Sequence, residues 1–112
     1  MLRVSAIYPN QPGSHFDCDD YVDRHTGFAR ELLSPYGLRD IRITLGTAAL
    51  DGTPPPYWAL SELLFEDRDS FDRAMDICGA TLMGDAPHYT NVDPVLQVSS
   101  LIDKPSDKIG QP

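Results

Sequence analysis

Four stretches of the chain have the residue pattern of β-strands, and in the first two of them hydrophobic and polar residues alternate with a two-residue period. The first stretch covers residues 2–8, and the turn-forming residues 9–13 end it. The others cover residues 38–45, 57–65 and 95–101. Both alternating faces of residues 57–65 are apolar, which predicts a central strand that is covered on both sides.

Two further stretches carry apolar residues at three- and four-residue steps, the period of a helix with one buried face. Asp17 is placed to cap the first helix, because free N–H groups at a helix start favour a carboxylate. We expect this helix to end at residues 34–37. Asp67 is placed to cap the second helix, and Gly79 predicts a break before a short continuation. The predicted core-facing residues are Cys18, Tyr21, Val22, His25, Phe28, Ala29 and Leu32 in the first helix, and Phe71, Ala74, Met75, Cys78 and Leu82 in the second.

The element order β-α-β-β-α-β predicts a ferredoxin-like α+β fold, in which two helices pack on one face of a four-stranded antiparallel sheet. A chain of 112 residues fits one domain, for which we expect residues 1–103, followed by a flexible tail over residues 104–112. The other face of the sheet is partly apolar, and no helix remains to cover it. We therefore expect a homodimer.

Charge and hydropathy narrow the classes of partner. The chain has 9 Lys and Arg against 17 Asp and Glu, a formal net charge of -8. Such a field repels polyanions, so neither nucleic acid nor an anionic membrane is an expected partner. No apolar stretch approaches the roughly 18 to 20 residues of a membrane helix, and the start lacks a signal-peptide pattern. We expect a cytoplasmic protein.

The motifs of common cofactor sites are missing from the sequence. Cys18 and Cys78 form neither a disulfide framework nor a zinc-ligand pattern. The three histidines lack metal-site spacing, and no glycine-rich nucleotide motif occurs. We therefore expect no metal and no cofactor.

Five short segments, in order along the chain, resemble those of the EthD family. They are residues 4–10 with 16–17, the Tyr-x-x-x-His step over residues 21–25, residues 54–57 with 64–65, the Asp-x-Pro-x-Tyr-Thr loop over residues 85–90, and the closing strand over residues 94–99. Each segment is short, but five in the right order and spacing are specific. Residues 26–27, Thr-Gly, stand where relatives commonly carry an apolar residue and proline. The resemblance covers about residues 1–101 and implies a dimeric α+β barrel.

His25 is the main candidate for chemistry, because it is titratable and lies on an otherwise apolar helix face. It could act as a general acid or base; alternatively it is a core histidine that bonds a tyrosine hydroxyl or a backbone carbonyl. The resemblance implies a cavity between helices and sheet, where this face points. Tyr89 could donate a hydrogen bond to a ligand and Asp85 could orient it or His25, or these residues could simply pin a loop. The candidate substrate-binding residues are Tyr8, Tyr21, Phe28, Trp58 and Thr90.

Two functions are consistent with these residues. The first is an EthD-like protein that binds a small apolar or aromatic metabolite, as a cofactor-independent lyase, dehydratase, cyclase or monooxygenase of degradation or secondary metabolism. Relatives accompany the degradation of ethyl tert-butyl ether. The second is a non-catalytic dimeric ligand-binding or accessory protein of an oxygenase pathway. Turnover would discriminate between them, whereas ligand binding would not.

Overall fold

The computed structural model describes residues 1–102, so the predicted tail at residues 104–112 lies outside the described residues. The strands lie within one residue of their predicted bounds: the first extends to Pro9, one residue beyond its predicted end, and the last ends at Ser100, one residue before its predicted end. The elements are β1 (Leu2–Pro9), the π-helical η1 (Asp20–His25), α1 (Thr26–Leu33), the 3-10 turn η2 (Ser34–Tyr36), β2 (Leu38–Leu45), β3 (Tyr57–Phe65), α2 (Arg68–Gly84), the 3-10 turn η3 (Ala86–His88) and β4 (Val95–Ser100).

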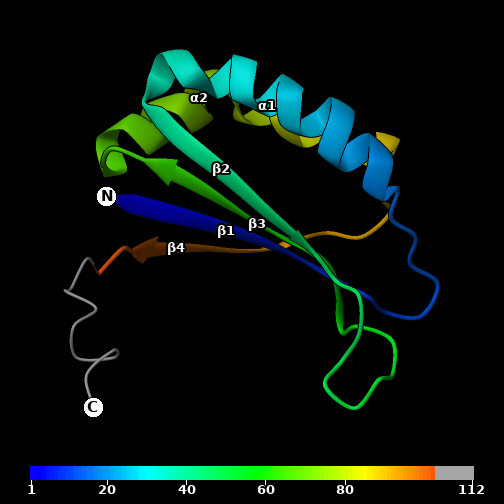
Figure 1. Ribbon diagram of the computed structural model, residues 1–112. Helices are drawn as coiled ribbons and strands as arrows, with labels where there is room; N and C mark the ends of the chain where they lie inside the picture. The colour runs from blue at the N-terminus through cyan, green and yellow to red at the C-terminus, as the bar shows by residue number, and fades with distance from the viewer. Residues whose placement is uncertain (103–112) are drawn as a thin grey trace, which may run out of the picture.

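The four strands form one antiparallel sheet in the order β2-β3-β1-β4. Figure 1 shows α1 and α2 over the same face of this sheet. The predicted ferredoxin-like α+β fold is therefore confirmed. None of the helices in residues 1–102 is long and apolar enough to span a membrane.

The core divides into two clusters along β1. At one end Val4 belongs to an aliphatic cluster that includes Leu33 and Phe65, both completely buried. At the other end Ala6 and Tyr8 belong to a mainly aromatic cluster. Burying one large apolar side chain stabilises a fold by about 1.5 to 3 kcal/mol. The aliphatic cluster thus holds the helices on the sheet, and the aromatic cluster surrounds the candidate site.

The first helical segment begins as predicted, because Oδ1 of Asp17 accepts a hydrogen bond of 3.0 Å from the backbone N–H of Asp20. Its buried face differs from the prediction. The buried residues follow strict four-residue steps, whereas Val22 is 39% exposed and Phe28 is half-buried. A π-helical turn has i→i+5 hydrogen bonds and therefore more residues per turn than an α-helix. In η1, residues four apart thus lie on the same face of the helix. The buried residues are Tyr21, His25, Ala29 and Leu33.

The second helix is continuous, so the predicted break at Gly79 is wrong. A glycine inside a helix weakens it by only about 1 kcal/mol relative to alanine, which the packing of α2 on the sheet overcomes. The predicted cap is confirmed, because Oδ1 of Asp67 accepts a hydrogen bond of 2.8 Å from the backbone N–H of Ser70.

Candidate active site

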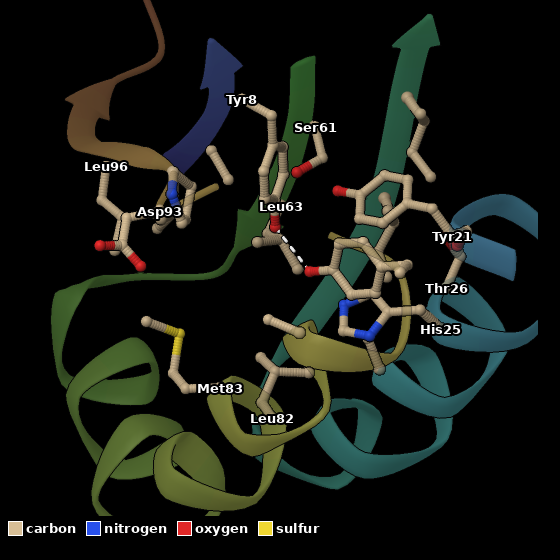
Figure 2. Close-up of a pocket in the computed structure, with 18 of the residues that line it drawn as sticks. Tyr8, Tyr21, His25, Thr26, Ser61, Leu63, Leu82, Met83, Asp93 and Leu96 are labelled. Atoms are coloured by element: carbon tan, nitrogen blue, oxygen red, sulfur yellow. Dashed lines mark hydrogen bonds between the residues drawn. The ribbon is translucent and has the colours of Figure 1, made fainter. Parts of the chain in front are cut away.

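A cavity of about 320 Å³ lies between the two helical segments and the sheet. Its size is at the lower end of the range for small-molecule sites, about 300 to 1,000 Å³. Most of the lining is aliphatic, whereas the polar groups other than Asp93 gather towards η1, as Figure 2 shows. The cavity opens between the end of α2 and β4, because the lining residues Met83, Asp93 and Leu96 are exposed there. The polar side chains at the inner end are Tyr8, Tyr21, His25, Ser61 and Tyr89.

His25 lines the cavity from the end of η1 and is only 8% exposed. Its Nδ1 lies 2.6 Å from Oδ2 of Asp85, which follows directly on α2. The imidazole ring stacks on Tyr21, with ring centroids 5.3 Å apart, and lies 4.7 Å from the ring of Tyr89. The ring is thereby held by two aromatic neighbours and at one nitrogen.

Arg24 holds the carboxylate that contacts His25. Its two terminal nitrogens donate hydrogen bonds of 2.9 and 3.1 Å to the two oxygens of Asp85. The guanidinium also binds Asp20, one helical turn earlier. These hydrogen bonds from Arg24 are the main cause that lowers the pKa of Asp85 below its ordinary value, while the His25 ring adds to the effect. Asp85 is therefore an ionised carboxylate at neutral pH.

The ionised Asp85 determines which nitrogen of neutral His25 carries the proton. A carboxylate only accepts hydrogen bonds, so Nδ1–H must donate to it and Nε2 must keep its lone pair. Within residues 1–102, Nε2 makes no hydrogen bond to another residue. It is also not one of the fully buried side-chain polar atoms of that range that lack a partner, so it is not enclosed by protein. His25 lines the cavity, and Nε2 is the ring nitrogen that Asp85 does not occupy.

Two tyrosine hydroxyls meet beside the imidazole. The hydroxyl oxygens of Tyr8 and Tyr89 lie 2.8 Å apart, and Figure 2 shows this contact inside the cavity. Whichever hydroxyl donates, the other keeps a proton for a ligand. Burial raises the pKa of Tyr89 to about 12, and burial also raises the pKa of Tyr8. Both hydroxyls are therefore protonated donors at neutral pH.

Tyr21 extends the row of phenols towards β3. Burial raises the pKa of Tyr21, and the nearby Ser61 hydroxyl partly offsets the shift. The Tyr21 ring lies 4.8 Å from that of Tyr89, measured between centroids. The inner end of the cavity thus combines one basic nitrogen with several neutral hydroxyl groups.

The loop that carries Tyr89 is tied to the entry of the first helical segment. The backbone carbonyl of Tyr89 accepts a hydrogen bond of 2.7 Å from the N–H of Asp17. The Thr90 hydroxyl donates one of 2.7 Å to the carbonyl of His15 and accepts one of 3.1 Å from the N–H of Val92. Two segments distant in sequence therefore position the site together.

Comparison with known proteins establishes the relationship of this chain. No protein-family model matches it, and no curated protein does. The solved structure of an EthD-like protein from Ralstonia eutropha JMP134 is 31% identical, with a TM-score of 0.84, over 95% of this chain and 96% of that one. The chain belongs to the EthD family.

Two further structures share the fold at lower identity. An ethyl tert-butyl ether D (EthD) family protein from Bacillus halodurans C-125 is 23% identical over 91% of this chain and 99% of that one, with a TM-score of 0.72. A cofactor-independent oxygenase from Streptomyces nogalater is 8% identical over 92% and 93%, with a TM-score of 0.59. Both likenesses show the fold alone.

Four of the five EthD-like segments identified in the sequence contribute residues to the lining of this cavity; residues 54–57 with 64–65 do not. The Tyr-x-x-x-His step places Tyr21 and His25 on the buried side of η1, and the loop over residues 85–90 supplies Asp85 and Tyr89. Tyr8 lines the cavity from β1. The structure thus brings together the three candidate catalytic residues and two of the candidate substrate-binding residues.

Three candidate substrate-binding residues do not line the cavity. Phe28 turns away from it because the four-residue steps bring Ala29 to the buried face instead. Trp58 stacks on Phe16, with centroids 6.4 Å apart, and its indole N–H donates to the Ser14 hydroxyl. The hydroxyl of Thr90 is occupied by the loop contacts described above. These residues support the site without reaching its interior.

Two residues of this EthD-family site were missed in the sequence. Ser61 shares one face of β3 with Ala59 and Leu63 and looks like a polar interruption of a core-facing row. Arg24 precedes the candidate histidine and lies four residues after Asp20, a spacing typical of an exposed helical ion pair. Nothing in the sequence connects Arg24 with Asp85, 61 positions later. Within residues 1–102 no group of three or more His, Cys, Asp or Glu side chains is arranged to hold a metal ion.

Proposed function

We propose that this EthD-family protein is an enzyme that moves a proton on a small apolar or aromatic metabolite, using protein side chains alone. The observation that carries the proposal is the position of His25, which lines the cavity while Asp85 holds its Nδ1 and leaves Nε2 without a protein partner in residues 1–102. A general base must reach the proton that it abstracts, and a fixed imidazole nitrogen at a cavity wall meets that condition.

The proposed step is proton abstraction from carbon next to a carbonyl group. Nε2 of His25 takes the proton, and the electron pair of the broken C–H bond moves onto the carbonyl oxygen to form an enolate. A neutral tyrosine hydroxyl, from Tyr8 or Tyr89, donates a hydrogen bond to that oxygen. Donors positioned where negative charge develops lower the barrier. The imidazolium is stabilised by Asp85, and it returns the proton when the product forms.

The aliphatic walls define the substrate class. The cavity can hold a compact molecule with one oxygen acceptor at its inner end, because the hydroxyl donors and the imidazole lie together there. Aromatic ketones and related phenolic compounds are examples of such a substrate. Dehydration, cyclisation and carbon–carbon bond cleavage all contain a step of this kind.

The test uses 2-tetralone, a two-ring ketone with exchangeable protons next to its carbonyl, in deuterated buffer. Deuterium incorporation measured by NMR should exceed the buffer rate in the wild type. His25→Gln should lower the protein-dependent rate by about 100-fold or more, as expected for a lost general base. His88→Gln is the matched control, because His88 is exposed and does not line the cavity.

A second variant distinguishes ligand binding in the cavity from ligand binding on the protein surface. Ala29 lines the cavity and is 5% exposed, so Ala29→Phe should fill part of it and abolish both binding and exchange. If the wild type binds 2-tetralone in a way that Ala29→Phe prevents, yet exchange equals that in buffer, proton transfer is refuted. The non-catalytic ligand-binding function then takes its place.

We also propose that the protein works as a homodimer. The sheet face opposite the helices carries the half-buried Ile7, Leu60 and Leu64 and the exposed Val95, and α1 and α2 both lie on the other side. Burying this face against a second copy would remove apolar surface from water.

A further inference from the structure

Asp93 lines the open side of the cavity, in the segment between η3 and β4. Figure 2 shows it across the cavity from His25, with Met83 and Leu96 on its own side. The side chain is exposed. Within residues 1–102 no hydrogen bond or ion pair involves its carboxylate, and of the aspartates in that range it is the one that lines the cavity.

The surroundings of Asp93 make its charge relevant to a ligand. The lining residues near it are apolar, including Leu82, Met83 and Leu96. A ligand that fills the cavity would displace water from this region, and charge interactions strengthen as the local dielectric falls. The outer end of the ligand would then lie beside the Asp93 carboxylate, which no basic side chain within residues 1–102 neutralises.

The inner and outer ends of the cavity therefore differ in chemistry. The inner end offers hydroxyl donors and a basic nitrogen, which suit an oxygen acceptor. The outer end offers a negative charge, which attracts an ammonium group and repels a carboxylate. We propose that Asp93 is a specificity-determining residue that selects small aromatic substrates with an amine at their outer end and rejects anionic ones. This proposal rests on the proposed cavity function and names the substrate class more closely.

The test compares three probes that share one ring system: 2-naphthylmethylamine, 2-naphthalenemethanol and 2-naphthoate. Calorimetric titration at pH 7 and low salt gives their dissociation constants. We expect the wild type to bind the ammonium form about tenfold more tightly than the carboxylate, with the alcohol between them. Asp93→Asn should reduce this ratio to about twofold and leave the affinity for the alcohol unchanged.

The net charge of the chain provides an alternative explanation that a control excludes. A net charge of -8 also disfavours anions, but a distant charge acts weakly and is screened by salt. Asp76→Asn removes the same charge from an exposed position on α2 that does not line the cavity. It should keep the tenfold ratio. A ratio that Asp93→Asn leaves unchanged, or that both variants reduce equally, overturns the proposal.

Failure of this proposal is distinguishable from failure of the proposed function. If Ala29→Phe abolishes binding of 2-naphthalenemethanol but Asp93→Asn does not alter charge selectivity, the cavity binds ligands and only the role of Asp93 is wrong. If no probe binds the wild type, or Ala29→Phe leaves binding intact, both proposals are overturned. Equal thermal unfolding midpoints for wild type and Asp93→Asn would exclude a change of fold.

Discussion

Arg24 donates hydrogen bonds of 2.9 and 3.1 Å to the two carboxylate oxygens of Asp85. Because the same carboxylate meets Nδ1 of His25, Arg24 acts on the imidazole without touching the cavity. This arrangement extends the candidate site by one positioning residue, and it leads to the first prediction.

Arg24→Gln should lower the rate of the proposed proton transfer by about tenfold or more while leaving ligand affinity nearly unchanged. Hydrogen bonds to charged groups contribute about 1.5 to 3 kcal/mol, and about 1.4 kcal/mol corresponds to tenfold in rate. Lysine cannot form the paired contact, so Arg24→Lys should restore only part of the activity. The ¹⁵N shifts of His25 should show Nδ1–H in the wild type and mixed tautomers in Asp85→Asn. An unchanged tautomer in Asp85→Asn would contradict the positioning role.

The lowered pKa of Asp85 predicts a pH-dependent part of the stability. Its native pKa lies below the ordinary value of 3.8, so between the two values the unfolded chain binds more protons than the native one. Stability therefore rises with pH in this window, and the contribution of Asp85 is complete above pH 3.8 and lost as the pH falls through the native pKa. Urea unfolding should be measured from pH 2.5 to 7. The difference in free energy of unfolding between wild type and Asp85→Asn should shrink as the pH falls. A gap that is constant with pH would refute this.

A homodimer should sediment as a single species of twice the chain mass at micromolar concentration, with more than roughly 1,200 Å² of surface buried in total. Leu60→Glu places a charge on the open sheet face and should shift the protein to monomers, with an unchanged circular dichroism spectrum. Leu50→Glu is the control, because Leu50 is fully exposed in the loop between β2 and β3. A wild type that sediments as a monomer would disprove the dimer.

The two hydrophobic residues of the first helix should differ in their contribution to stability. Leu33 is completely buried, so Leu33→Ala should cost about 2 to 5 kcal/mol in free energy of unfolding. Phe28 is half-buried and outside both core clusters. Phe28→Ala should therefore cost less than the roughly 3 kcal/mol at which buried phenylalanines begin. Denaturant titration of both variants checks which substitution costs more free energy of unfolding. The sequence pattern alone, which placed Phe28 but not Leu33 on the core-facing side, predicts the opposite order.

Two glycines should respond to alanine in opposite ways. In Gly79→Ala the new Cβ would meet only the Met75 side chain, Cβ at 3.7 Å and Sδ at 3.8 Å, which are ordinary contacts, so the helix should gain about 0.5 to 1 kcal/mol. Gly37 has a φ of 91°, and a Cβ there would lie 2.8 Å from Cβ of Ser70, so Gly37→Ala should destabilise the protein. Thermal unfolding midpoints that move in the same direction would contradict this.

Local pattern determined the elements of this protein. Alternation in residues 2–8 and 38–45, and the apolar stretches at residues 57–65 and 95–101, placed the four strands nearly to the residue. The carboxylates of Asp17 and Asp67 marked two helix starts, because capping is an interaction between near neighbours in sequence. The order of the elements was then sufficient for the fold, and a histidine on an apolar face was sufficient to single out His25.

Tertiary structure decided which side chains meet in the cavity. The choice of Ala29 over Phe28 depends on a π-helical turn, whose slight change in winding no simple periodicity contains. The bonds from Asp85 to Arg24 and His25 join groups 61 and 60 positions apart. They exist only because the fold brings the end of α2 next to η1. Asp93 faces the cavity for the same reason. Contacts of this range are set by the path of the whole chain, so no local pattern of residues encodes them.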